Sequence, residues 1–205
     1  CRTSCLNSPS FIERKLAALQ AYFEWMPIRP VAENDHLNIY RQFDFGGLVN
    51  LMMLDTRILA RHKQLNYKDY MTATGIDAVK FQADLLNPQR TLMGVAQRQW
   101  LQEQLMQSTA PWNVLGQQVL MAKMLIPQEL LLFLGQITNS DQRPETLAQM
   151  KQKIEEFVTL KMRLKANDPT LTAMDEARLN AVAPYNLDAW DGYAYEREVV
   201  YGTLQ

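Results

Sequence analysis

The sequence predicts a mixed α/β fold, and three observations carry this prediction. Two nearly continuous apolar runs, Leu48–Leu54 and Trp112–Met121, have the pattern of buried strands. Amphipathic helix patterns precede, separate and follow these runs, so that helices and strands alternate along the chain. Helices gather in the last third of the sequence, and no internal repeat is found.

Composition and charge exclude several classes of protein. The 205 residues are 47% hydrophobic and 21% charged, with 8 Gly and 9 Pro, which is typical of a globular chain. The sequence has 21 Lys and Arg and 22 Asp and Glu, so its net charge is −1. A chain with so little net charge is not attracted as a whole to nucleic acid or to anionic lipid. The longest apolar run, Leu130–Leu134, is far shorter than the roughly 20 residues that cross a bilayer. We expect no dedicated nucleic-acid partner and no membrane span.

The first element is predicted to be a helix. Ser10 and Glu13 have the spacing of a capping box, and apolar residues recur at intervals of three and four as far as Met26. Pro27 and Pro30 end the helix because proline lacks the backbone N–H. The expected buried stripe is Ile12, Leu16, Leu19, Phe23 and Met26.

Two strands are predicted next. Residues 39–45 alternate as in a half-exposed strand, and Gly46-Gly47 supplies a turn. The run Leu48–Leu54 is expected to be a strand buried on both faces. Asp55-Thr-Arg57 follows directly, so polar side chains stand at the end of this strand.

The middle of the chain predicts a long loop, a helix and a third strand. Residues 60–90 are rich in turn formers, and we expect a surface loop with short helical pieces. A helix over Gly94–Gln107 is expected to have a glutamine-rich outer face. The third strand, Trp112–Met121, is expected to be buried, with Gln117 and Gln118 toward its far end. The expected inward residues of the helix are Val95, Trp100, Leu101 and Leu105.

The last third of the chain predicts mostly helices. The segments are Pro127–Leu134, Pro144–Lys165, Ala173–Val182 and Pro184–Thr203. The first fits either a short helix or a strand, and the second is a long amphipathic helix with proline at its first turn. We expect residues 125–182 to form a helical excursion over one face or edge of the sheet, with Ile154 and Phe157 buried.

Few side chains can carry catalysis alone. His36 lies in a segment with no strand before it, and His62 stands between two cationic residues, so we expect both to be solvent-exposed. No serine lies in a Gly-x-Ser-x-Gly elbow. Gly46-Gly47 precedes a strand rather than a helix and forms no phosphate-binding loop. The sequence shows no nucleophilic triad and no histidine-based acid–base pair.

Cys1 and Cys5 are the only cysteines, one helical turn apart. This spacing fits a disulfide or half of a metal site, but no second cysteine pair or nearby histidine completes such a site. We expect two inert thiols.

Polar residues at the ends of elements remain as candidates for a site. Asp55 and Arg57 follow one predicted strand, and Gln117 and Gln118 lie toward the end of another. In open α/β sheets ligands gather at the carboxyl ends of strands. The alternative is that Asp55 caps the turn after its strand and pairs with Arg57.

A second group of candidates lies near the carboxyl terminus. Asp188 and Asp191 surround an aromatic cluster formed by Trp190, Tyr193 and Tyr195. Because no Lys or Arg alternates with these rings, we expect them to pack in the interior rather than to bind nucleic acid.

Four blocks of sequence form a specific combination. They are Ala21-Tyr-Phe-Glu-Trp-Met-Pro-Ile-Arg-Pro30, Ile39–Leu48 running on to Leu54-Asp-Thr-Arg57, Arg90–Leu101, and Trp112–Val119 joined to Asn186-Leu-Asp-Ala-Trp-Asp-Gly-Tyr193. In order and spacing they resemble the PhoD-like alkaline phosphatases, over about Phe11–Leu204.

The resemblance implies a fold, an activity and cofactors. The fold is a segment of a four-layered α/β/β/α metallophosphoesterase sandwich with added helices. The activity is hydrolysis of phosphomonoesters and phosphodiesters by a periplasmic or secreted enzyme, with calcium and iron near the strand ends. The preference between monoester and diester stays open.

The metal-binding motifs of the family do not occur in residues 1–205. These motifs are an Asp with a Gly-Asp-x-x-Tyr segment, an Asp-Asp-His-Glu segment and a Gly-Asp-x-His segment. We expect the chain to be the middle portion of a catalytic domain, as a fragment or a truncated relative, that binds no metal and is inactive alone. The alternative is a non-catalytic module that binds a partner, or self-associates, through an exposed sheet.

The resemblance also places residues beside the active site of an intact enzyme. There an amide can orient a phosphoryl oxygen or a metal-bound water without carrying charge. For Asp188 the alternative is that it caps the helix that follows. The residues expected beside the site are Asp55, Arg57, Gln117, Gln118, Asp188 and Trp190.

Overall fold

The computed structural model of the chain describes residues 10–33, 35–72, 75–131 and 144–204. These form two compact units. Unit 1 comprises Cys1–Lys63, Leu85–Leu120 and Tyr193–Gln205, and unit 2 comprises Gln64–Asp84 and Met121–Gly192. No helix in the described ranges is long and apolar enough to cross a membrane.

Unit 1 begins with helix α1 (Phe11–Trp25). The predicted capping box is confirmed, because Glu13 N–H donates to Ser10 Oγ and Ser10 N–H donates to Glu13 Oε2. The predicted buried stripe is largely wrong: Leu19 is buried, whereas Ile12 and Leu16 are exposed. Nothing in the described part of the chain covers these two side chains, although their spacing is that of a core-facing stripe.

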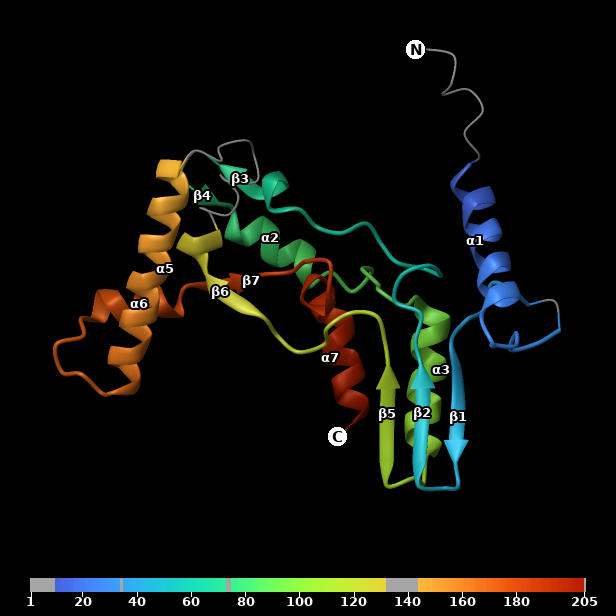
Figure 1. The fold of residues 1–205 in the computed structure, drawn as a ribbon. Coiled ribbons are helices and arrows are strands. Elements are labelled where there is room, and N and C mark those ends of the chain that lie inside the picture. The colour runs from blue at the N-terminus through green and yellow to red at the C-terminus, as the bar shows by residue number, and fades with distance from the viewer. Residues whose placement is uncertain (1–9, 34, 73–74, 132–143, 205) are drawn as a thin grey trace, which may run out of the picture. The chain divides into compact units, whose positions relative to one another are not determined.

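Three strands form the sheet of unit 1 (Figure 1). They are β1 (Arg41–Phe45), β2 (Val49–Met53) and β5 (Trp112–Gly116). The middle strand β2 runs antiparallel to β1 and parallel to β5. Gly46 and Gly47 turn the chain between β1 and β2 with φ values of +63° and +69°, which other residues rarely adopt. The predicted strands and turn are confirmed, although each strand is shorter than expected.

The two faces of this sheet differ. On one face Asn50 and Met52 are buried. On the other face apolar side chains in adjacent register are exposed, including Phe45 at 57% and Trp112 at 66%. The prediction that β2 is buried on both faces and β5 throughout is therefore wrong for the described residues. Their apolar pattern is that of strands with a second covering layer, and no described element of unit 1 supplies it.

Helix α3 (Val95–Gln107) and the last helix α7 (Ala194–Thr203) pack together in unit 1. Gln102 Nε2 donates to Thr203 Oγ1 across this contact at 3.0 Å. Leu101 is buried as predicted, but Val95 is exposed. The predicted outer face of glutamines is wrong at Gln97, which is buried.

Unit 2 begins with short elements. They are the 3-10 helix η1 (Tyr67–Tyr70), strands β3 (Met71–Thr72) and β4 (Gly75–Ile76), and helix α2 (Ala78–Leu85), whose last residue belongs to unit 1. β3 and β4 pair antiparallel. The predicted loop with short helical pieces therefore also contains a small hairpin.

The rest of unit 2 is mainly helical. Its elements are β6 (Leu125–Pro127), α5 (Pro144–Lys165), α6 (Ala173–Asn180) and β7 (Val182–Pro184), followed by the 3-10 helix η2 (Trp190–Tyr193), which leads into α7. β6 and β7 pair antiparallel. The segment Pro127–Leu134 fitted either a short helix or a strand. In the structure Pro127 ends a strand and residues 128–131 are helical, while residues 132–134 lie outside the described ranges. The helix predicted over Ala173–Val182 ends at Asn180, because Val182 begins β7.

An apolar cluster joins α5 to α6. Phe157, Leu160 and Leu179 are buried together. Arg178 packs against this cluster, with its guanidinium carbon 5.1 Å from the Phe157 ring. The same guanidinium forms ion pairs with Glu129 and Glu156, each at 2.7 Å. These contacts lower the pKa of Glu156, with the hydrogen bond from Arg178 as the largest cause. Phe157 is buried as predicted, but Ile154 is 42% exposed, and the docking of residues 125–182 on the sheet stays a prediction.

Candidate functional site

The carboxyl ends of β2 and β5 meet at one edge of the sheet, because the two strands are parallel. Met53 pairs with Gly116 at this edge, and Leu54 N–H donates to Gly116 O at 2.7 Å. The polar segment Asp55-Thr-Arg57 leaves β2 here, and Gln117 and Gln118 follow β5. We call residues 54–57 with Gln118 the strand-end site.

Gln118 binds the chain that leaves β2. Its Oε1 accepts hydrogen bonds from Thr56 N at 3.0 Å and from Thr56 Oγ1 at 2.6 Å. Its Nε2 donates to Leu54 O at 2.8 Å. The structure thus brings together the two strand ends singled out from the sequence, and Gln117 beside them is half-buried.

Gln97 of α3 holds the same segment from inside. Its Oε1 accepts from Asp55 N at 2.7 Å, and its Nε2 donates to Asp55 O at 2.8 Å. Both backbone hydrogen-bonding groups of Asp55 are therefore satisfied by one buried side chain. Sequence reasoning missed Gln97, although its spacing of four residues from the buried Leu101 places both on one helix face.

Asp55 is 1% exposed at the centre of the site. Its Oδ1 accepts hydrogen bonds from Arg57 N at 2.9 Å and Ile58 N at 2.8 Å, so the predicted turn cap is confirmed. Its Oδ2 is buried and has no hydrogen-bond partner among the described residues. A buried carboxylate oxygen without a donor is costly, and such groups mark places where a further partner binds.

Positive charge lies beside the strand-end site. Arg61 Nη1 donates to Thr56 O at 3.1 Å. Arg61 and Arg90 each place the guanidinium carbon 5.0 Å from the ring of the buried Tyr193, whose hydroxyl donates to His62 O at 2.6 Å. Tyr193 packs in the interior as predicted, although arginines distant in sequence lie against it, whereas the same prediction is wrong for Tyr195, which is 38% exposed.

Glu196 of α7 fixes the loop before α3. It is fully buried, and its carboxylate accepts from Thr91 Oγ1 at 2.7 Å and from the backbone N–H groups of Leu92 and Met93. Arg98 lies 3.6 Å from the same carboxylate. The sequence did not predict this contact, because Glu196 and Thr91 are about a hundred residues apart along the chain.

Asp188, Trp190 and Asp191 belong to unit 2, so their predicted place beside the strand-end site stays a prediction. Trp190 is fully buried, and Asp188 is half-buried. Asp191 Oδ2 accepts from Met124 N at 2.8 Å. Burial, with a smaller contribution from the charge of Asp191, raises the pKa of Tyr67, whose hydroxyl donates to Pro184 O.

The described side chains do not make a complete metal centre. No three His, Cys, Asp or Glu residues in the described ranges come together as ligands, and Asp55 contributes a single buried carboxylate oxygen without a donor. His36 and His62 are exposed, as predicted, and the His36 ring stacks on Phe23 with centroids 5.2 Å apart. Cys1 and Cys5 lie outside the described residues.

Comparison with known proteins gives three consistent matches. The family model for PhoD-like phosphatases matches residues 5–205. Alkaline phosphatase D of Bacillus subtilis (strain 168) is 40% identical over 117 residues, which are 56% of this chain and 18% of that protein. A solved structure described as the structure of PhoD matches with a TM-score of 0.54 and 28% identity, covering 96% of this chain and 27% of that chain. The chain therefore spans less than a third of each relative.

Proposed function

Because the chain belongs to the PhoD-like phosphatase family, we propose that it forms part of the catalytic domain of an enzyme that hydrolyses phosphate esters. The single observation that carries this proposal is the strand-end site. There Asp55 is buried at the shared carboxyl edge of parallel strands, Gln97 binds its backbone and Gln118 binds Leu54 and Thr56 on either side of it, and one of its carboxylate oxygens has no donor among the described residues. Ligands of open α/β sheets bind at this edge.

The side chains of the site have different tasks in this proposal. Gln97 and Gln118 hold the backbone of residues 54–56 rigid, so that Asp55 keeps one orientation. Asp55 Oδ2 accepts a hydrogen bond from a group in the completed active site and orients it. Arg61, fixed on Thr56 O, supplies positive charge that favours a phosphate dianion nearby.

The remaining parts of the enzyme are proposed to come from polypeptide outside residues 1–205. Calcium and iron, as the resemblance implies, would be held there, because the described residues do not form a metal centre. A periplasmic or secreted location belongs to the same proposal. The substrate is a phosphate ester.

A second candidate function is that of a non-catalytic interaction module. It rests on the uncovered sheet face, where Phe43, Phe45 and Trp112 are exposed and where Phe45 and Trp112 flank Val49 in one row. Such a face favours association, either with a partner or with a second copy. In the catalytic proposal the same face is covered by another layer of the enzyme.

We expect residues 1–205 alone to show no metal-dependent phosphatase activity above background and to retain no stoichiometric calcium or iron. The reason is that a cation needs several convergent oxygen or nitrogen ligands, and the described residues do not provide them. A full-length protein containing the chain is expected to hydrolyse p-nitrophenyl phosphate, and a chelator is expected to abolish this activity. The measurements are turnover and metal content of both proteins.

The two candidate functions separate in this experiment. Chelator-sensitive turnover by residues 1–205 alone would contradict the expectation that the metal ligands lie elsewhere. A full-length protein that folds, binds metal and hydrolyses no phosphate ester would overturn the catalytic proposal and favour the interaction module.

A further inference from the structure

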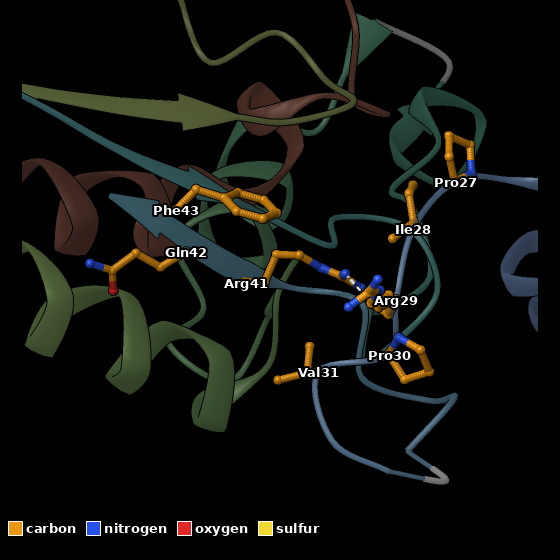
Figure 2. Close-up of a pocket in the computed structure, with 8 residues that line it drawn as sticks. All are labelled: Pro27, Ile28, Arg29, Pro30, Val31, Arg41, Gln42 and Phe43. Atoms are coloured by element: carbon orange, nitrogen blue, oxygen red, sulfur yellow. Dashed lines mark hydrogen bonds between the residues drawn. The ribbon is translucent and has the colours of Figure 1, made fainter. Parts of the chain in front are cut away.

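A pocket of about 490 Å³ opens in unit 1 beside β1 (Figure 2). Its walls are the segment 27–31, which follows α1, and residues 41–43 at the start of β1. In Figure 2 the Arg41 side chain extends from β1 to the backbone of Arg29. The pocket therefore lies between two segments that a hydrogen bond holds together.

The pocket lies at the same edge of the sheet as the strand-end site. Arg41 pairs with Met53, and Met53 pairs with Gly116, so these three residues form one row across the sheet. Asp55 comes two residues after Met53 in the sequence, and two residues of an extended chain span about 7 Å. The pocket and the strand-end site therefore lie at the same end of the strands.

Two arginines line the pocket. Arg41 is held in place, because Nη1 donates to Arg29 O, Nε donates to Ile39 O at 3.3 Å, and the guanidinium carbon lies 6.0 Å from the Phe23 ring. Its Nη2 is buried without an acceptor among the described residues. The Arg29 side chain is exposed and has no partner in that part of the chain, and none of the lining residues is acidic.

Apart from Gln42, the other residues that line the pocket are apolar. Ile28, Pro30, Val31 and Phe43 line it beside the two arginines. Guanidinium groups bind phosphate through charge-assisted hydrogen bonds, whereas the apolar walls favour contact with carbon atoms rather than with a free hydrated anion. The chemistry that fits both features is a phosphate group attached to a carbon chain.

We propose that this pocket binds a second phosphate group, carried on the alcohol portion of the substrate, while the ester to be cleaved lies at the strand-end site. This inference rests on the proposed function and adds the substrate class: phosphate esters whose alcohol carries a further phosphate. Arg29 supplies the contact to that phosphate. Arg41 holds the 27–31 segment and adds a fixed charge.

Binding is tested on residues 1–205, without any need for catalysis. Butyl phosphate is expected to shift the backbone amide signals of Ile28, Val31 and Phe43 in NMR spectra, and inorganic phosphate is expected to shift them far less. Arg29→Gln is expected to weaken butyl phosphate binding roughly tenfold, as the loss of a charge-assisted hydrogen bond predicts. Arg29 is the residue changed because Arg41 braces the fold, and Arg14→Gln on the exposed surface of α1 is the matched control.

Selectivity is tested on a full-length protein containing the chain. The KM for 1,4-butanediol bisphosphate is expected to lie below that for butyl phosphate, and Arg29→Gln is expected to abolish most of this difference while Arg14→Gln preserves it. Equal KM values for the two substrates, or equal shifts by inorganic phosphate and butyl phosphate on residues 1–205, would overturn the pocket assignment. Absence of hydrolysis with butyl phosphate still bound at Arg29 would overturn the proposed function alone.

Discussion

Replacement of Glu196 by alanine is expected to lower the free energy of unfolding by about 3–5 kcal/mol. The carboxylate is fully buried and accepts hydrogen bonds from Thr91 Oγ1 and from the N–H groups of Leu92 and Met93. Alanine leaves these donors without acceptors and Arg98 without its buried partner. Because the loop at residues 91–94 leads into α3, loss of these bonds loosens the helix that carries Gln97.

The measurement is urea unfolding of residues 1–205 with a matched pair of variants. Glu196→Gln keeps one acceptor oxygen and is expected to destabilise the protein less than Glu196→Ala. Glu103→Ala removes an exposed carboxylate from α3, the helix that packs against α7, and is expected to change the free energy of unfolding by less than about 0.5 kcal/mol. Equal stability of the two alanine variants would show that the Glu196 contacts do not hold the fold together.

Replacement of Gln118 by alanine in a full-length enzyme is expected to cut turnover roughly tenfold or more. Three hydrogen bonds from this one amide hold Leu54 and Thr56, so their loss releases the segment that orients Asp55. The melting temperature is expected to change little, because the Gln118 side chain lies at the surface of unit 1. Asp188→Ala is expected to have the same effect on turnover if Asp188 lies beside the site.

Turnover and melting temperature of the same samples separate a site role from a structural one. Gln99→Ala, an exposed glutamine on the outer face of α3, is the control and is expected to leave both quantities unchanged. Variants of Gln118 and Asp188 that keep their turnover and only melt earlier would assign both residues to the scaffold.

Local signals made much of the fold predictable from the sequence. The capping box of Ser10 and Glu13 marks the start of α1, and Gly46-Gly47 marks the turn between β1 and β2. The helix over Pro144–Lys165 has the predicted bounds, because proline favours the first turn and an apolar stripe continues to its end. In each case the residues that decide the structure are close together in the sequence.

Burial was harder to predict, because it depends on which layers are present. Trp112 and Ile12 have the pattern of core residues, yet both are exposed in the described chain. A period of two or of three to four residues identifies an apolar face, but it does not identify what covers that face. The burial of Gln97 was missed for a related reason: its backbone partner, Asp55, lies 42 residues away.

The candidate site was predictable in part. Asp55 and Gln118 were singled out because strand ends in α/β sheets bind ligands, and the structure brings them together through Thr56. The arginines that lie against Tyr193 were missed, because Arg61, Arg90 and Tyr193 come from segments far apart in the sequence. Short motifs indicate positions on strands, whereas contacts between distant loops need the fold.

Asp55, through the buried oxygen that has no donor among the described residues, is proposed to orient a group in the active site of a phosphate-ester hydrolase. The most direct test is the turnover of p-nitrophenyl phosphate by Asp55→Asn in a full-length protein. Asparagine keeps the oxygen that caps the turn at Arg57 and replaces Oδ2 with an amide nitrogen. Asp44→Asn is the matched control, because Asp44 also caps a turn, at Gly47, but is exposed away from the site. A loss of turnover of roughly tenfold or more is expected in Asp55→Asn at a similar melting temperature. Equal turnover in the two variants would contradict it.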